Sequence, residues 1–389
     1  MPTLLVRNAV LLAKIESVEG TDAAPDPTGA TNAVLVEQPL RITFNPTVID
    51  TTEVNPSLDP FDPIVGGMSS QIEFDVYLKG RPTLAGVVPE WGPLLRACGF
   101  AQTAVTTAIP SSPEALAAGS STVRATLGTT GSATADLYRG MPVSFSSAVT
   151  LNSFIWDYSA AKLAKITNTA GANLSTSTLW QIPAHMQYAP ASSSIPSVTI
   201  WIYNDGLLYK FVGCRGNASV RVTSGGPGRL SFRFMGQLTT KTDSAMPTST
   251  VSYDNTRPPI WKGGSFTINS VEAAVTDMTM DFGNQVTQPD NPSATEAFDP
   301  AIITSRMMRG SVNPKETLVA TRDIMADFRA QTKSPLAAYW GTAVGNRVGL
   351  VAPSALYLNQ TPGERNAYRT VEVPFHATGR DAGFYVIIW

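Results

Sequence analysis

Two distant stretches of the chain share one pattern of aromatic, proline and acidic residues. In residues 44–64 the pattern reads Phe44-Asn45-Pro46, Asn55-Pro56-Ser57 and Phe61-Asp62-Pro63-Ile64; in residues 282–302 it reads Phe282-Gly283-Asn284, Asn291-Pro292-Ser293 and Phe298-Asp299-Pro300-Ala301-Ile302. Both stretches are long connections between segments with strand-like alternation. A supersecondary unit that occurs twice in one chain predicts a duplicated domain, and duplication favours a ring or an array.

The composition favours an all-β chain with much of its surface in protein contacts. Charged residues make up 15% of the 389 residues, against about 25% in ordinary globular domains. The net charge of −2 gives no basic footprint for nucleic acid. Cys98 and Cys214 have no CxxC partner, so we expect buried thiols in a protein made in a reducing cytoplasm. No apolar run approaches the roughly 20 residues of a membrane span, and we expect no signal peptide.

Apolar and polar residues alternate with period 2 along many segments, which predicts half-buried antiparallel strands. The expected strands cover residues 40–44, 71–76, 198–203, 207–212, 218–223, 229–236, 266–268, 277–282, 301–309, 347–351, 355–358, 369–377 and 383–388. Two helices are expected. Residues 89–98 have Pro near the start and Gly at the stop, and residues 316–330 have amphipathic spacing. Residues 239–262 are polar and Pro-rich and are expected to be a linker.

Residues 110–190 differ from the rest by their density of Ser, Thr, Ala and Gly, with short strand-like pieces at 122–127, 142–146, 153–157 and 179–183. We expect a small β module inserted in a surface loop. The predicted organisation is a discontinuous first domain over 1–109 and 191–247, the inserted module over 110–190, and a second domain over 248–389. The fold class is all-β dominated, with minor α.

No constellation for catalysis or metal binding stands out. His185 and His376 lack partners at metal-ligand spacing, and HExxH, GxSxG, GxxxxGK[ST] and GxGxxG are absent. Asp59 and Asp62 could bind calcium, but rigid Asp-Pro turns are the stronger interpretation. Trp156, Trp180 and Trp201 could form a sugar-binding platform, although core packing is the commoner role. We therefore expect no enzyme activity and no cofactor.

The two repeated loops are acidic and lack basic residues. Their carboxylates suggest docking surfaces with a basic counterpart, and the alternative is that the loops stay solvated. The loop carboxylates are Asp50, Glu53, Asp59, Asp62, Asp290, Glu296 and Asp299. The candidate basic counterparts are Arg306, Arg309, Arg215 and Arg221.

Several motifs resemble phage tail tube proteins, the major tail proteins of long non-contractile siphophage-type tails. The motifs are Gly66-Gly67 with Ile72-Glu73-Phe74-Asp75-Val76, the run Pro89-Glu90-Trp91-Gly92-Pro93-Leu94-Leu95-Arg96-Ala97-Cys98-Gly99-Phe100, Tyr203-Asn204-Asp205-Gly206, and Gly213-Cys214-Arg215-Gly216-Asn217. Two further segments, Leu137-Tyr138-Arg139-Gly140-Met141-Pro142 and Ile182-Pro183-Ala184-His185-Met186-Gln187-Tyr188, resemble an insertion seen in some members. The resemblance covers the first half, and the second half follows through its repeat relation.

The resemblance implies two tandem β-sandwich or half-barrel domains, each with a flanking helix and a long stacking loop. Copies would assemble side by side and close a barrel, which removes exposed strand edges. Single-domain members form hexameric rings, so a duplicated chain implies a homotrimeric, pseudo-hexameric ring. The long loops would reach the next ring, and the inserted module would face outward. The implied partners are copies of the same chain, a tape measure protein, and tail terminator or distal tail proteins, with no membrane. The implied location is the virion tail, after synthesis in the bacterial cytoplasm.

The function implied is a structural one: stacked rings form a conduit for double-stranded DNA during ejection. A wall that bound phosphates would slow the DNA, so the lumen should be neutral or acidic. The residues predicted to face the lumen are Gln71, Glu73, Asp75, Asp277, Thr279 and Asp281, on strands taken to be equivalent. Arg41 and Arg233 would partly neutralise them. Two alternatives remain open: another tail ring component, such as a distal tail or terminator protein, and a carbohydrate-binding adhesin.

Overall fold

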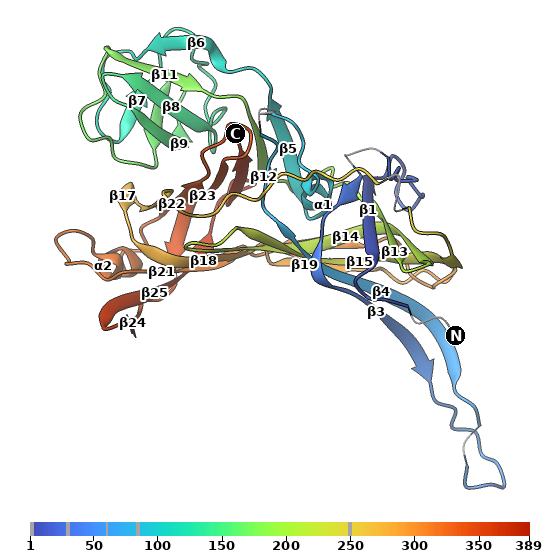
Figure 1. Ribbon diagram of the computed structural model, residues 1–389. Helices are drawn as coiled ribbons and strands as arrows, with labels where there is room; N and C mark the ends of the chain where they lie inside the picture. The colour runs from blue at the N-terminus through green and yellow to red at the C-terminus, as the bar shows by residue number, and fades with distance from the viewer. Residues whose placement is uncertain (1–3, 29–31, 60, 83–85, 248–250) are drawn as a thin grey trace.

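The computed structural model describes residues 4–28, 32–59, 61–82, 86–247 and 251–389. The described chain is almost entirely β, with two six-residue helices, α1 (Gly92–Ala97) and α2 (Ile324–Arg329). One long hairpin leaves the body at the lower right of Figure 1, and a separate small β module lies at the upper left. The predicted fold class is confirmed.

A central sheet of eight strands runs through the whole body, and every neighbouring pair in it is antiparallel. In spatial order the strands are β3 (Glu37–Ile49), β4 (Ile64–Tyr77), β15 (Arg229–Asp243), β14 (Leu207–Thr223), β18 (Val275–Asp281), β21 (Arg309–Pro314), β25 (Tyr368–Ala377) and β24 (Thr361–Arg365). The first four strands come from the first half of the chain and the last four from the second half. The β14–β18 ladder therefore joins the two halves.

The strand order of the first half repeats in the second. In each half the sheet runs first, second, fourth, third strand, so β3, β4, β14 and β15 correspond to β18, β21, β24 and β25. Ile42 pairs with Ile72 between β3 and β4, and Met280 pairs with Gly310 between β18 and β21. Met280 thus lies 238 positions after Ile42, and Gly310 lies 238 positions after Ile72. Phe44 and Phe282, which opened the sequence pattern, have the same offset.

The register also corrects one expectation. Residues 71, 73 and 75 lie on β4, whereas residues 277, 279 and 281 lie on β18, which corresponds to β3. The two sets are therefore not on equivalent strands. Period-2 alternation is the same on both strands of a hairpin, so alternation by itself cannot tell the two apart. The offset of 238 residues between Phe44 and Phe282 agrees with the register and aligns residues 277–281 with 39–43.

One face of the central sheet is packed into the main core. Phe74 and Phe232 are buried with ring centroids 5.7 Å apart, and Phe234 stacks 6.0 Å from Phe74. Helix α1 covers this face with buried Leu94 and Leu95. The helix falls inside the predicted range 89–98, with Pro near its start. Because the core contains residues from both halves, the halves are packed together as one body.

A second layer of strands covers this core. Over the first half lie β2 (Ala33–Val34), β1 (Ala9–Ile15) and β13 (Val198–Asn204). Towards the second half lie β5 (Phe100–Val105), β12 (His185–Pro190), β26 (Tyr385–Ile388), β23 (Val348–Tyr357), β22 (Ser334–Trp340), β16 (Ser265–Ile268) and β17 (Val271–Glu272). The β12–β26 pairing joins the two halves a second time.

The inserted module is a six-stranded sheet with its own core around Trp180. Its strands in spatial order are β6 (Ile109–Ala115), β11 (Thr178–Ile182), β8 (Pro142–Ser147), β9 (Leu151–Tyr158), β10 (Leu163–Ile166) and β7 (Arg124–Thr126). The module rests on the second half, where the Phe154 ring lies 5.3 Å from Trp389 and 6.2 Å from Tyr339.

Several element predictions differ from the structure. The segments 347–351 and 355–358 are one strand, β23, and the linker expected from residue 239 begins inside β15. The segments 207–212 and 218–223 are one strand, β14, with a register shift at Gly213, which has φ 62°. The expected strand 301–309 is divided into β20 (Ile302–Arg306) and the start of β21. The helix expected over 316–330 is shorter, because the Glu316 amide donates to the Arg369 carbonyl in the sheet; the helix begins only after Asp323, whose carboxylate accepts from the Ala326 amide at 2.9 Å.

We predict that Phe234→Ala lowers the free energy of unfolding by about 3–5 kcal/mol, because the ring is fully buried among Phe74 and Phe232. Urea denaturation followed by fluorescence measures the change. The matched control is Thr240→Ala on the exposed end of the same strand, expected within about 0.5 kcal/mol of the parent. Equal stability of the two variants would contradict this account of the core.

Candidate assembly surfaces

The β3–β4 hairpin projects from the body as an arm, defined here as the described residues of 44–65 (Figure 1). Its ladder continues from Asn45 opposite Ser69 to Ile49 opposite Ile64, beyond the edge of the packed core. The arm exposes an unusual number of large apolar side chains. They are Phe44, Val48, Ile49, Val54, Leu58, Phe61, Ile64 and Val65, with Val54 102% and Leu58 104% exposed. Clustered exposed apolar surface of this kind marks a protein-binding surface.

The second repeated loop behaves differently, because its hairpin folds back onto the chain. Gly283, with φ 63°, turns the chain between β18 and β19 (Asn284–Thr287), and β19 pairs with β20 as a separate two-stranded sheet. Asn284 Nδ2 donates to the carbonyls of Cys98 at 2.7 Å and Gly216 at 3.1 Å. The second hairpin thus lies against the first half of the same chain.

The second half of this loop, from Glu296 to Ala301, is held by the first half of the chain. The Gln237 side-chain amide donates to the Phe298 carbonyl, and the Ala301 amide donates to the Gly213 carbonyl at 3.0 Å. A Cβ atom on Gly67 would overlap the Glu296 carbonyl oxygen, so the loop backbone touches the base of the arm. The two repeated loops therefore differ in placement: the first projects from the body, and the second lies on its own chain.

The acidic residues of the two loops have correspondingly different surroundings. Among the described residues, Asp50, Glu53, Asp59 and Asp62 of the first loop form no ion pair. In the second loop, the Asp299 carboxylate accepts from the Asn291 amide at 2.6 Å. Asp290 forms a β-bridge with Phe298, and Glu296 is partly buried.

The four basic residues predicted as counterparts fall into two pairs. Arg215 and Arg306 are engaged with backbone carbonyls: Arg215 donates to Ala301 at 2.7 Å, and Arg306 donates to Gly99 at 2.8 Å and Ala191 at 2.7 Å. Burial lowers the pKa of Arg306, and the nearby Asp381 carboxylate opposes that shift. Arg221 and Arg309 are exposed on the polar face of the central sheet. Within the described residues, none of the four contacts a carboxylate of the acidic loops.

The polar face of the central sheet carries interleaved charges of both signs. Glu73 lies opposite Arg41 on β3 and 3.4 Å from Arg233 Nε, and Arg233 also donates to Gln71 at 2.8 Å. Asp281 lies opposite Arg309 and accepts from the Asn217 amide at 2.8 Å. All six residues predicted for the lumen share this face, on the side of the sheet opposite α1 and the core.

The central sheet ends in two strands with unpaired outer edges. In the described part of the chain, β3 pairs only with β4, and β24 pairs only with β25. An open edge presents a row of unpaired amide and carbonyl groups and is a template for pairing with another chain. The sheet therefore offers one edge at each end for further strands.

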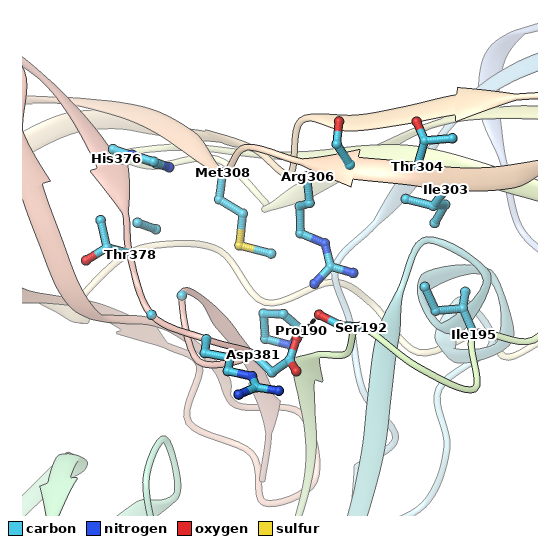
Figure 2. A pocket seen from close by; sticks show the side chains of 15 residues that line it. Pro190, Ser192, Ile195, Ile303, Thr304, Arg306, Met308, His376, Thr378 and Asp381 are labelled. Carbon is cyan, nitrogen blue, oxygen red and sulfur yellow. Dashed lines mark hydrogen bonds between the residues drawn. The ribbon is translucent and has the colours of Figure 1, made fainter.

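A hollow of about 400 Å³ lies between β20 and the end of β25 with the turn that follows it at residues 378–383 (Figure 2). Arg306 and Met308 point into it from one side, and Pro190, Ser192 and Asp381 lie across from them. The Ser192 hydroxyl donates to the Asp381 carboxylate at 2.5 Å. Its charged or titratable lining side chains are Arg306, His376, Arg380 and Asp381.

The tryptophan and histidine candidates differ in their surroundings among the described residues. Trp180 is buried, and Lys210 lies 3.8 Å over the ring of Trp201, as Lys165 lies 5.0 Å over Trp156. His185 is buried, which lowers its pKa to about 4. Over the described residues, no group of three metal-ligating side chains gathers, and no helix has the length and apolarity to cross a bilayer.

We predict that Gly283→Ala destabilises the chain by at least about 1 kcal/mol more than Gly225→Ala. Both glycines have positive φ, 63° and 78°, but only at Gly283 would a Cβ overlap a neighbour, the Met307 carbonyl. Urea unfolding compares the two, and hydrogen exchange should show faster exchange at 288–301 in Gly283→Ala alone. Equal effects would show that the turn does not hold the second hairpin.

Comparison with known proteins gives one match. A family model described as "Phage tail tube protein" matches residues 6–377, which is nearly the whole chain. No curated protein matches the chain.

Proposed function

Because the chain belongs to the phage tail tube protein family, we propose that it assembles into three-chain rings that stack into a tube for double-stranded DNA. The observation that carries the ring is the repeated four-strand unit. Inside one chain, β14 of the first unit pairs with β18 of the second. The counterparts of these two strands are β24 and β3, the two strands with open edges.

The directions of the strands agree with closure between copies. Eight strands that alternate in direction place β24 antiparallel to the β3 strand of a following copy. The β14–β18 junction thus supplies the pattern for a β24–β3 junction between chains. Three copies give six units and twenty-four strands, and a closed barrel leaves no edge exposed.

The internal junction also specifies a register for the contact between chains. Ser219 pairs with Asp281 across the internal junction. The counterpart of Ser219 is Thr361. Ser219 pairs with Ser231 on β15, Thr361 pairs with Glu372 on β25, and Ser231 and Glu372 are at equivalent positions of these two corresponding strands. The counterpart of Asp281 is Thr43, 238 positions earlier. We therefore place Thr361 of one copy opposite Thr43 of the next.

The polar face suits the wall of a DNA conduit. Its carboxylates and guanidinium groups are interleaved, and Glu73 forms an ion pair with Arg233, so the surface carries both signs at short range. A wall without a basic stripe makes few phosphate contacts and releases few counterions, so it holds DNA weakly. We propose that Gln71, Glu73, Asp75, Asp277, Thr279 and Asp281 face this lumen.

The arm is proposed to join one ring to the next through its exposed tip. Val54 and Leu58 are fully exposed, and burial of such side chains contributes roughly 1.5–3 kcal/mol each. The second loop is bound to its own chain, so each ring would present three projecting arms. Tape measure and tail-end proteins would bind the ends of the tube.

We predict that Thr43→Cys combined with Thr361→Cys gives disulfide-linked multimers of up to three chains on oxidation, because directly opposed residues have Cβ atoms close enough for a disulfide. Denaturing gels without reductant measure the products. Either single variant should give none of these multimers above the parent level. Rings by electron microscopy without this cross-link would overturn the register.

We predict that Val54→Ser with Leu58→Ser leaves rings intact but prevents long tubes, because the arm tip loses its apolar contact. Negative-stain electron microscopy distinguishes single rings from stacks with a lumen wide enough for duplex DNA. The control is Val123→Ser with Leu137→Ser, exposed apolar residues of the inserted module. Unchanged tubes would refute the stacking role, and a monomeric parent at high concentration would refute assembly itself.

A further inference from the structure

The hollow beside Arg306 occupies the place in the second unit that the folded loop fills in the first unit. The folded loop contacts Gly67 and Gln237 of the first unit. The strand register gives Ser305 as the counterpart of Gly67 and Thr378 as the counterpart of Gln237. Both Ser305 and Thr378 line the hollow.

We propose that this hollow receives the segment Phe61–Ile64 from the arm of the adjacent copy in the same ring. The proposal rests on the proposed ring, since the β24–β3 junction brings that arm beside the second unit. Within the chain, the folded hairpin of the second unit crosses the β14–β18 junction and lies on the first unit. By the same relation, the arm of a following copy crosses the β24–β3 junction and lies on the second unit.

The segment and the hollow match in chemistry. The folded loop places Phe298 and Pro300 against the first unit, at Gln237 and Gly213. The sequence repeat gives Phe61 and Pro63 in the arm, with Asp62 between them. Phe61 and Ile64 are each 57% exposed in the single chain. The hollow offers them apolar walls from Pro190, Ile195, Ile303 and Met308.

The charges of the hollow favour an acidic segment. Arg306, His376 and Arg380 line it, against a single carboxylate, Asp381, which already accepts from Ser192. Arg306 is satisfied by backbone carbonyls, so its charge contributes at a distance, whereas Arg380 is exposed. Asp62 forms no ion pair among the described residues, and Arg380 is the partner the proposal assigns to it.

This docking leaves the arm tip available for the neighbouring ring. In the folded loop the residues at the tip, Pro292, Ser293 and Thr295, stay exposed while Ala301 is buried. The corresponding arm would bury Phe61–Ile64 laterally and keep Val54 and Leu58 outside. One arm would thus contact a neighbour in its own ring and a copy in the next ring.

We test the contact with Asp62→Cys combined with Thr378→Cys in the full chain, assembled and then oxidised. The proposal expects disulfide-linked chains in rings. Asp62 follows Phe61, whose counterpart Phe298 accepts a hydrogen bond from Gln237, and Thr378 is the counterpart of Gln237. Asp62→Cys combined with Ala161→Cys, an exposed position in the module, should give none. The Thr43→Cys and Thr361→Cys pair, which reports the strand edges, is assayed in parallel. If this edge pair forms cross-links and the Asp62→Cys and Thr378→Cys pair does not, the arm proposal is overturned and the ring proposal stands. If neither pair forms cross-links, the ring proposal is overturned.

A charge exchange tests the same contact without cysteine. Arg380→Glu should raise the protein concentration needed for ring assembly by about fivefold, as expected for a partly exposed ion pair. Adding Asp62→Arg to Arg380→Glu should restore assembly to near the parent value, whereas Asp62→Arg alone should weaken it. Arg257→Glu, an equally exposed arginine outside both contacts, is the control and should have no effect. Failure of the double variant to recover while both single variants stay folded would refute the pairing.

Discussion

The β14–β18 ladder is the interaction on which the rest of the structure depends. Five residue pairs, from Ser219 opposite Asp281 to Thr223 opposite Asp277, join two repeat units into one continuous sheet. Without this ladder, each unit would expose the amides and carbonyls of another edge, and buried or half-buried backbone groups without partners are costly. The shared sheet also brings Phe74, Phe232 and Met280 into one core, which a pair of separate domains could not form.

A single turn accounts for most of the asymmetry between the two units. The two hairpins have the same register offset, yet the arm continues straight while the second hairpin bends at Gly283, where φ is positive. The counterpart position in the arm is Asn45, which lies in the ladder opposite Ser69. Glycine adopts positive φ at little cost, so Gly283 permits the bend by which the second hairpin packs on its own chain. The arm does not pack on its own chain and is available for the intermolecular contacts proposed above.

The sequence predicted the repeat, the all-β class and which residues share one face of a strand. These features could be predicted because the two-residue period and the turn residues are local properties of the sequence. The residues that share a polar face, from Gln71 to Asp281, were found in this way. The equivalence of strands was missed, because β3 and β4 have the same alternation; the offset of 238 residues between Phe44 and Phe282 carries that equivalence, and the pairing of β4 with β15 makes it plain. The bend at Gly283 and the anchoring of Arg215 and Arg306 on carbonyls also depend on partners distant in sequence. The short helix α2 shows the same limit, because the sheet draws Lys315 and Glu316 out of an otherwise amphipathic pattern.

Charges of both signs lie side by side on the polar face. In three ladders of the central sheet a strand rich in carboxylates lies beside one that carries arginine: β4 beside β3, β4 beside β15, and β18 beside β21. Exposed ion pairs of this kind contribute little to stability, about 0–1 kcal/mol. Their consequence is electrostatic: a polyanion that passes over the face meets opposite charges within a few ångströms, and at physiological ionic strength their fields cancel beyond about one Debye length. A face built this way repels DNA less than an acidic wall and retains it less than a basic one, and in the proposed ring this balance would recur with every copy.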